Sequence, residues 1–259
     1  MAGFQSIKTA VVAPVFNEPD TWLSIATELT QYFDLVVVVD DGSAQELHCP
    51  NMDGVVILRH DKNMGKGAAL RSGFQYCLDQ NASLIGTIDT DGEHDPRNFI
   101  SALGLYRGED MVALSRAPFF NRYSKQRRFR NELISKILAH RTGVPFEDTQ
   151  TGMRLFSSAA VEACLDVDMP KGYAVETIML ETISARKMAM SELPMQHEGV
   201  VRNGKKYCDA GVFWTDFQTF FSRFVMGTRA ARPANGTALN HLTQANASQT
   251  YSAKSVTQQ

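Results

Sequence analysis

Short apolar runs alternate with longer amphipathic stretches through the first half of the chain. The runs are rich in β-branched residues and continuously apolar, which is typical of strands covered on both faces of a parallel sheet. They are Thr9–Val15, Leu35–Val39, Val55–Leu58, Leu84–Ile88 and Met111–Leu114. Strands that alternate with helices in this way predict an α/β fold with a mainly parallel sheet flanked by helices.

The stretches between these runs, and two later ones, have the spacing of amphipathic helices. The helices are expected over Asp20–Tyr32, Gly67–Gln80, Pro96–Tyr106, Arg127–Arg141 and Val175–Lys187. The second half is less regular, with a polar turn over Glu147–Gly152. We predict a single enzyme-sized domain over residues 1–206.

The C-terminal region changes character twice. Residues 207–232 are predicted to hold a C-terminal amphipathic helix, because five aromatic residues of Val212–Gly227 share one helical face. These are Phe213, Phe217, Phe220, Phe221 and Phe224. The stripe fits two alternatives, packing on the domain core or lying in a membrane interface. Residues 233–259 are rich in Ala, Asn, Thr, Ser and Gln, which predicts a disordered tail.

The composition limits the classes of partner and the cellular location that we expect. The chain carries 26 basic and 28 acidic residues, a formal charge of -2, and its basic residues are not interleaved with aromatic ones, so nucleic acid is not expected as a partner. The four cysteines include no Cys-x-x-Cys pair and predict reduced thiols. Without a signal-like or spanning segment, a cytoplasmic location is expected, with peripheral contact at the inner membrane face left open.

Polar clusters follow three of the predicted strands where each strand ends. They are Asn17-Glu18, Asp40-Asp41-Gly42-Ser43 and Asp89-Thr90-Asp91-Gly92. Each cluster alone is ordinary turn chemistry. Open parallel sheets bind ligands at the carboxyl ends of their strands, so three clusters at one edge predict a binding site.

Two common nucleotide-binding motifs do not fit. The residues after the first strand lack the Gly-x-Gly-x-x-Gly of a dinucleotide-binding fold, and Gly65-Lys66-Gly67 lacks the upstream glycine of a P-loop. Asp89 and Asp91 instead alternate along a strand end, where both carboxylates can reach one cation. Such oxygen ligands suit Mg²⁺ or Mn²⁺, which complete their shell with water and phosphate oxygens.

Four segments together resemble the ordered signature of family 2 glycosyltransferases with the GT-A fold. They are Pro14-Val15-Phe16-Asn17-Glu18, Val39-Asp40-Asp41-Gly42-Ser43, Asn63-Met64-Gly65-Lys66-Gly67-Ala68 and Asp89-Thr90-Asp91-Gly92-Glu93-His94-Asp95-Pro96. The resemblance covers residues 8 to 206 and is strongest to the dolichol-phosphate mannosyltransferase branch. Residues 1–206 would then be the catalytic domain.

The resemblance implies a donor site and a metal site. The donor-binding residues would be Pro14, Asn17, Glu18, Asp40, Asp41, Lys66 and Asp89. The metal ligands would be Asp89, Asp91 and Glu93, where Glu93 stands in place of the glutamine common in that branch. Asp91 is favoured as a direct ligand, while Asp89 would bind the metal directly or through water, or would contact the ribose.

A dense basic patch follows the fifth predicted strand and suits a phosphate, which arginine grips bidentately. By resemblance, the acceptor phosphate would be bound by Ser115, Arg116, Arg130, Ser135 and Arg202, with Leu114 replacing the usual glycine. The expected catalytic residues are Asp91, Asp148 and Arg130. A phosphate oxygen needs no general base, whereas a sugar hydroxyl would need one, and Asp148 and Glu176 are then the candidates.

The sequence therefore predicts an inverting, metal-dependent glycosyltransferase that moves a sugar from a nucleoside diphosphate donor to a polyprenyl phosphate. Transfer to a glycan hydroxyl is the first alternative. A nucleotide-sugar binding protein without turnover is the alternative of another class. A glycosidase is disfavoured, because two carboxylates flanking a glycosidic bond would not explain a metal-type pair beside a nucleotide pocket.

Overall fold

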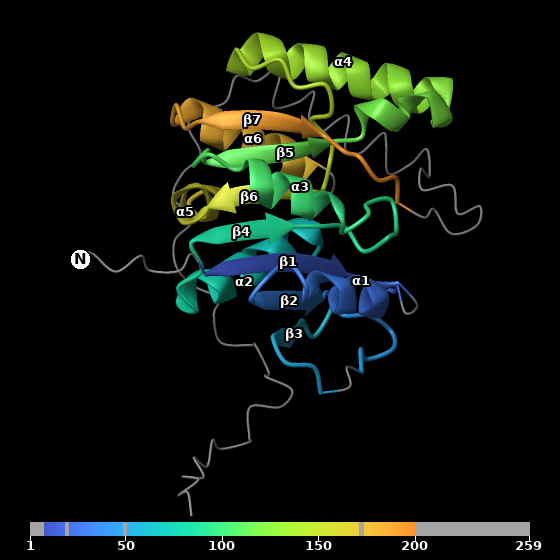
Figure 1. Ribbon diagram of the computed structural model, residues 1–259, viewed down its shortest axis with the longest axis vertical. Helices are drawn as coiled ribbons and strands as arrows, with labels where there is room; N and C mark the ends of the chain where they lie inside the picture. Colours follow the sequence, from blue (N-terminus) through green and yellow to red (C-terminus); the bar gives the residue numbers. More distant parts are fainter. Residues whose placement is uncertain (1–7, 19–20, 49–50, 171–173, 200–259) are drawn as a thin grey trace, which may run out of the picture.

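The structure is a computed structural model that describes residues 8–18, 21–48, 51–170 and 174–199. These residues form one sheet of seven strands in the order β3-β2-β1-β4-β6-β5-β7 (Figure 1). The strands are β1 Thr9–Val15, β2 Leu35–Asp40, β3 Val55–Arg59, β4 Leu84–Thr87, β5 Met111–Ser115, β6 Arg154–Ser157 and β7 Met190–Pro194. The predicted mainly parallel α/β sheet is confirmed, and all five expected strands are present.

Strands β6 and β7 are not among the predicted ones. β6 has only four residues and begins with Arg154, so it carries no apolar run. It runs antiparallel to both β4 and β5, while the other pairings of the sheet are parallel. β7 is a half-buried edge strand that contains Glu192 and ends in Pro194, as edge strands commonly do.

The helices are α1 Trp22–Leu29, α2 Lys66–Asp79, α3 Asn98–Leu105, α4 Lys125–Thr142, α5 Ser158–Leu165 and α6 Ala174–Ala185, with a short 3₁₀ helix η1 Ala117–Arg122. The five expected helices are present with shifted ends. For α4 the ends follow from capping: the Ser124 hydroxyl accepts a bond from the Arg127 N–H at 3.3 Å, and Gly143 ends the helix in the left-handed conformation.

The helices cover both faces of the sheet (Figure 1). Side chains of α2, α5 and α6 pack with one face in one buried cluster, and those of α1 and α3 pack with the other face in a second cluster. Helix α2 approaches β1 closely at Gly73, where a Cβ atom would lie 2.3 Å from Val12 Cγ1. The two layers fix the sheet and leave the carboxyl ends of the parallel strands for the site.

The predicted C-terminal amphipathic helix and the tail lie outside the described residues and stay predictions. In the part of the chain that the structure describes, no helix is long and apolar enough to span a bilayer. Cys77 and Cys164 are buried free thiols, and burial raises the pKa of each to about 12, so both stay protonated near neutral pH.

Candidate functional site

The three polar clusters lie together at the carboxyl edge of β1, β2 and β4. The parallel register places Val15 beside Asp40, so β1 and β2 end at the same level. The loops are then tied to each other: the Asn17 N–H donates to Ser43 Oγ at 2.9 Å, and Thr90 Oγ1 donates to the Pro14 carbonyl at 2.9 Å. The structure therefore brings the predicted clusters into one site.

The paired carboxylates at the end of β2, Asp40 and Asp41, are both buried. Asp40 is fully buried and forms an ion pair with Arg59 of β3. Asp41 Oδ1 is 2.7 Å from His60 Nδ1. The Asp41 carboxylate also accepts bonds from the backbone N–H groups of Met64 at 2.9 Å and Gly65 at 2.7 Å. These carboxylates shape the loop that leads into α2. Their predicted contact with the base or ribose stays a prediction.

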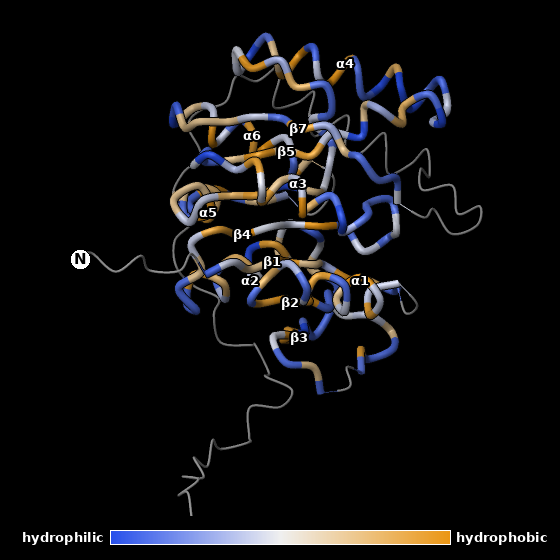
Figure 2. Tube along the Cα trace, in the orientation of Figure 1, coloured by the Kyte–Doolittle hydropathy of each residue, from blue (hydrophilic) through white to orange (hydrophobic). Residues whose placement is uncertain are grey.

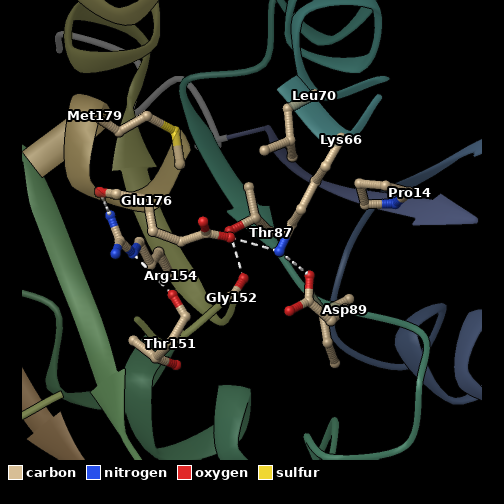
Figure 3. A pocket seen from close by; sticks show the side chains of 11 residues that line it. Pro14, Lys66, Leu70, Thr87, Asp89, Thr151, Gly152, Arg154, Glu176 and Met179 are labelled. Carbon is tan, nitrogen blue, oxygen red and sulfur yellow. Dashed lines mark hydrogen bonds and ion pairs between the residues drawn. The ribbon is translucent and has the colours of Figure 1, made fainter. Parts of the chain in front are cut away.

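Lys66 is the first residue of α2 and lies between two carboxylates (Figure 3). Its Nζ is 2.5 Å from Asp89 Oδ1 and 2.5 Å from Glu176 Oε1. Burial disfavours the charged amine, but Asp89 and Glu176 outweigh burial and raise the pKa of Lys66. In turn, the positive charge of Lys66 lowers the pKa of Asp89 despite the burial of this carboxylate. A fixed cation thus stands beside the predicted donor aspartate.

Lys66 and Asp89 line a pocket, and the side chains of Arg154 and Glu176 form another part of its wall (Figure 3). The Arg154 side chain is fully buried and donates to the carbonyls of Thr149, Thr151 and Glu176 at 2.8, 3.1 and 2.9 Å. Glu176 Oε2 is buried and has no hydrogen-bond partner among the described residues. Burial raises the pKa of Glu176, although Lys66 opposes the shift. Arg154 is therefore held firmly by backbone carbonyls, and the buried Glu176 carboxylate lies beside it.

Gly152 makes room for the Asp89 carboxylate. A Cβ atom at this glycine would lie 2.2 Å from Asp89 Oδ2. The Gly152 carbonyl also accepts a bond from Thr87 Oγ1 at 2.9 Å, which ties the 147–152 turn to the end of β4. This turn, predicted only as polar, is a wall of the site.

Asp89 and Asp91 form the carboxylate pair that was predicted to bind a metal. Burial, together with the charges of Asp89 and Glu93, raises the pKa of Asp91 to about 7. The two carboxylates supply the hard oxygen ligands that Mg²⁺ or Mn²⁺ would take, since these ions need only one or two protein carboxylates. Within the described ranges, no three His, Cys, Asp or Glu side chains are grouped as a metal site.

Glu93, predicted as a third metal ligand, is held by two arginines, and its role toward a metal stays a prediction. Arg127 Nη1 donates to Glu93 Oε1 at 2.8 Å and Arg127 Nη2 to Oε2 at 2.5 Å. Arg116 Nη1 donates to Glu93 Oε2 at 3.0 Å. These guanidinium groups overcome the effect of burial and lower the pKa of Glu93. Its carboxylate is directed towards the basic side of the site.

Arg116 is anchored from behind by Asp148. Asp148 is fully buried and accepts bonds from Arg116 Nε at 2.7 Å, from Nη2 at 3.0 Å and from the backbone N–H at 3.0 Å. Despite burial, Arg116 lowers the pKa of Asp148. A carboxylate whose two oxygens are both taken by a guanidinium is poorly suited as a general base.

The other predicted acceptor residues that the structure describes lie on β5 and α4. Ser115 and Ser135 are buried, and their hydroxyls bond to the Ala117 N–H at 3.2 Å and the Glu147 carbonyl at 3.1 Å. Arg130 lies on α4, three residues after the arginine that holds Glu93, and is half-buried. Arg202 lies outside the described residues. The acceptor roles of this group stay predictions.

Sequence reasoning missed the charge partners that the fold supplies. Glu176 was considered only as a base, and Arg127 only as part of a basic patch, because their partners lie 110 and 34 positions away in the chain. His94 is buried beneath the site with Nε2 3.4 Å from Thr151 Oγ1, and burial lowers its pKa to about 4. It is therefore neutral at pH 7.

A family model described as "Glycosyl transferase family 2" matches residues 10–165. Because this match covers more than half of the chain, the protein belongs to the family 2 glycosyltransferases, as predicted. A UDP-N-acetylglucosamine–dolichyl-phosphate N-acetylglucosaminyltransferase of Methanococcus voltae is 22% identical over 72% of this chain and 84% of the relative. A polyprenol monophosphomannose synthase of Mycolicibacterium smegmatis is 30% identical over 42% of this chain and 45% of the relative.

Solved structures share the GT-A fold. Glucosyl-3-phosphoglycerate synthase of Mycobacterium tuberculosis, crystallised with Mn²⁺, UDP and phosphoglyceric acid, has a TM-score of 0.58 at 19% identity, covering 84% of this chain and 78% of that one. Mannosyl-3-phosphoglycerate synthase of Rubrobacter xylanophilus has a TM-score of 0.59 at 17% identity, covering 89% and 79%. At these identities the likeness concerns the fold alone.

Proposed function

We propose that this glycosyltransferase moves a sugar from a nucleoside diphosphate donor to a polyprenyl phosphate. The observation that carries the proposal is the pair of arginines, Arg116 and Arg127, whose guanidinium groups converge on Glu93, two residues after Asp91. Guanidinium forks of this kind bind phosphate bidentately. The names of two relatives, a dolichyl-phosphate N-acetylglucosaminyltransferase and a polyprenol monophosphomannose synthase, support the same acceptor class.

The donor side is supported by the Asp89 and Asp91 pair and by Lys66. A bound Mg²⁺ or Mn²⁺ would neutralise negative charge on the departing nucleoside diphosphate. Lys66 is a second positive charge, held 2.5 Å from Asp89 by the buried Glu176, and it would meet the diphosphate without having to reorient. The UDP and Mn²⁺ in the neighbour from Mycobacterium tuberculosis are consistent with this arrangement.

A lipid acceptor is supported by the surface of α4. The helix begins beside Glu93 and is mostly hydrophilic (Figure 2). Yet Phe129 is 69% exposed and Leu133, one turn later, is 39% exposed. Lys125 and Arg128 are exposed around them. Exposed apolar side chains within a basic face suit the interface of an anionic bilayer, where a polyprenyl phosphate would be found.

The reaction would be one in-line displacement. An acceptor phosphate oxygen attacks the anomeric carbon, the bond from that carbon to the diphosphate breaks, and the nucleoside diphosphate leaves with inversion at the carbon. The attacking oxygen is already anionic, so no general base is required. The engagement of Asp148 with Arg116 agrees with such a mechanism. Asp148 would position the arginine, and Arg116 would orient the phosphate.

The test is transfer of labelled sugar into lipid. The purified protein is incubated with labelled UDP- or GDP-sugars and Mn²⁺, in parallel with polyprenyl phosphate, a glycan or 3-phosphoglycerate, and the lipid and aqueous phases are counted. We expect a labelled product that is stable to base and labile to mild acid. Label found only on a glycan hydroxyl, or only on 3-phosphoglycerate, would contradict the lipid acceptor. No nucleoside diphosphate release with any acceptor would favour a binding protein without turnover.

A further inference from the structure

Glu93 accepts the same bonds that a phosphate would accept. Its two carboxylate oxygens face the planar fork of Arg127 at 2.8 and 2.5 Å, and one of them also takes Arg116 Nη1 at 3.0 Å. The Glu93 side chain is 11% exposed, and that of Arg116 is 8% exposed. A carboxylate gripped by two guanidinium groups in a mostly buried site marks a place built for an anion.

Both arginines are held in place independently of Glu93. Arg116 is fixed by the buried Asp148. The Arg127 guanidinium stacks over the Tyr123 ring at 4.1 Å from the ring centre. The two forks would therefore keep converging if the Glu93 carboxylate moved away, which is the property of a preorganised binding site.

Glu93 is a weaker ligand for these forks than a phosphate monoester. A carboxylate offers one charge and two oxygens, whereas a phosphate monoester carries about -1.5 to -2 charges at pH 7 and offers three acceptor oxygens. The two arginines, Asp148 and Glu93 together sum to zero charge. An arriving phosphate that displaces Glu93 restores bidentate pairing with a more highly charged anion, so exchange is chemically feasible.

We propose that Arg116 and Arg127 form the acceptor-phosphate site and that Glu93 occupies this site until a phosphate monoester displaces it. The inference rests on the proposed function for the identity of the acceptor. It replaces Arg130 with Arg127 as the second arginine of the site. It also makes Glu93 a determinant of specificity, because a phosphodiester, with one charge, would displace the carboxylate less well than a monoester.

Titration calorimetry with inorganic phosphate, geranyl monophosphate, 3-phosphoglycerate and dimethyl phosphate tests the site. In Glu93→Gln, which keeps the side-chain shape, we expect the Kd for the monoesters to fall roughly tenfold, because the intramolecular competitor is removed. Glu132→Gln is the matched control, since Glu132 is 63% exposed on α4 and pairs with Lys136. Arg127→Met should abolish binding, whereas Arg107→Met, at an exposed arginine after α3, should retain it.

Unchanged phosphate affinity in both Glu93→Gln and Arg127→Met would overturn the proposal. If Glu93→Gln does not fold, the comparison of Arg127→Met with Arg107→Met decides alone. Tighter binding of geranyl monophosphate than of 3-phosphoglycerate points to a lipid source for the phosphate, and the reverse points to a soluble metabolite. If the variants bind phosphate as expected but the wild-type protein transfers no sugar to polyprenyl phosphate, the phosphate site is supported. The proposed function is then refuted.

Discussion

Replacing Gly152 with alanine is expected to lower the catalytic efficiency of sugar transfer by about a hundredfold, because a shift of about 1 Å in a reacting site can cost this much. The new Cβ atom would lie 2.2 Å from Asp89 Oδ2 and 2.4 Å from Asp89 Cγ. The carboxylate must then swing away, and its 2.5 Å contact with Lys66 would be lost. Steady-state kinetics with donor and Mn²⁺ measures the effect.

The fold should survive this substitution, since overpacking of this kind costs about 1–3 kcal/mol. Gly104→Ala is the matched control, because Gly104 lies in α3 with nothing within 4 Å of its Cβ position. That variant should keep full activity and gain about 0.5–1 kcal/mol of stability from the removal of a helical glycine. Equal activities of the two variants would show that Asp89 does not need its present position.

Asp148→Asn is expected to lower the free energy of unfolding by about 3 kcal/mol, because it removes the charge partner of a buried arginine. Asp148 is fully buried and accepts three bonds from Arg116, whose side chain is 8% exposed. Sugar transfer should fall as well, since Arg116, the arginine proposed to orient the acceptor phosphate, would lose its anchor. Urea denaturation of both proteins measures the stability difference.

The matched control is Asp166→Asn, which removes the partner of Arg186 at the surface, where the two side chains are 65% and 42% exposed. Such an exposed pair contributes about 0–1 kcal/mol. If both substitutions lowered the free energy of unfolding equally, the buried pair of Asp148 and Arg116 would stabilise the fold no more than the exposed pair.

The effect of Asp148→Asn should depend on pH. Arg116 holds the pKa of Asp148 below its usual value, so the ion pair stabilises the fold fully above the unfolded pKa of about 3.9. This contribution is lost as the pH falls through the lower folded pKa. The stability difference between wild type and variant should thus be equal at pH 7 and pH 5 and shrink below about pH 4. A difference that shrinks between pH 7 and pH 5 would argue against this pair as its origin.

Much of the fold followed from the hydrophobic pattern. Buried parallel strands such as Leu35–Asp40 are continuous apolar runs, and the helices between them have clear periodicity. Strand β6 could not be found in this way, because it has four residues and its first, Arg154, is a buried charge satisfied by backbone carbonyls. A buried arginine is paired by tertiary structure, which periodicity does not describe.

The site was predictable where its residues are adjacent in sequence. Asp89 and Asp91 stood out because polar residues follow an apolar strand at a sheet edge that binds ligands. The pairing of Glu93 with Arg127 was not predictable, since only the packing of α4 brings the arginine to this loop. The same holds for Lys66 and Glu176, which meet through α2 and α6. Long-range charge pairs are set by topology.

We propose that Asp91 helps to hold a divalent cation and, through it, the diphosphate of the donor. The most direct test of this proposal is the thermal shift produced by UDP- and GDP-sugars with and without Mn²⁺, in wild type and in Asp91→Asn. For wild type, a donor at 100 times its Kd should add about 2.7 kcal/mol of stability when Mn²⁺ is present. Asp91→Asn should lose the Mn²⁺-dependent part, while exposed Asp53→Asn should keep it. An undiminished Mn²⁺-dependent shift in Asp91→Asn would show that Asp91 does not hold the metal.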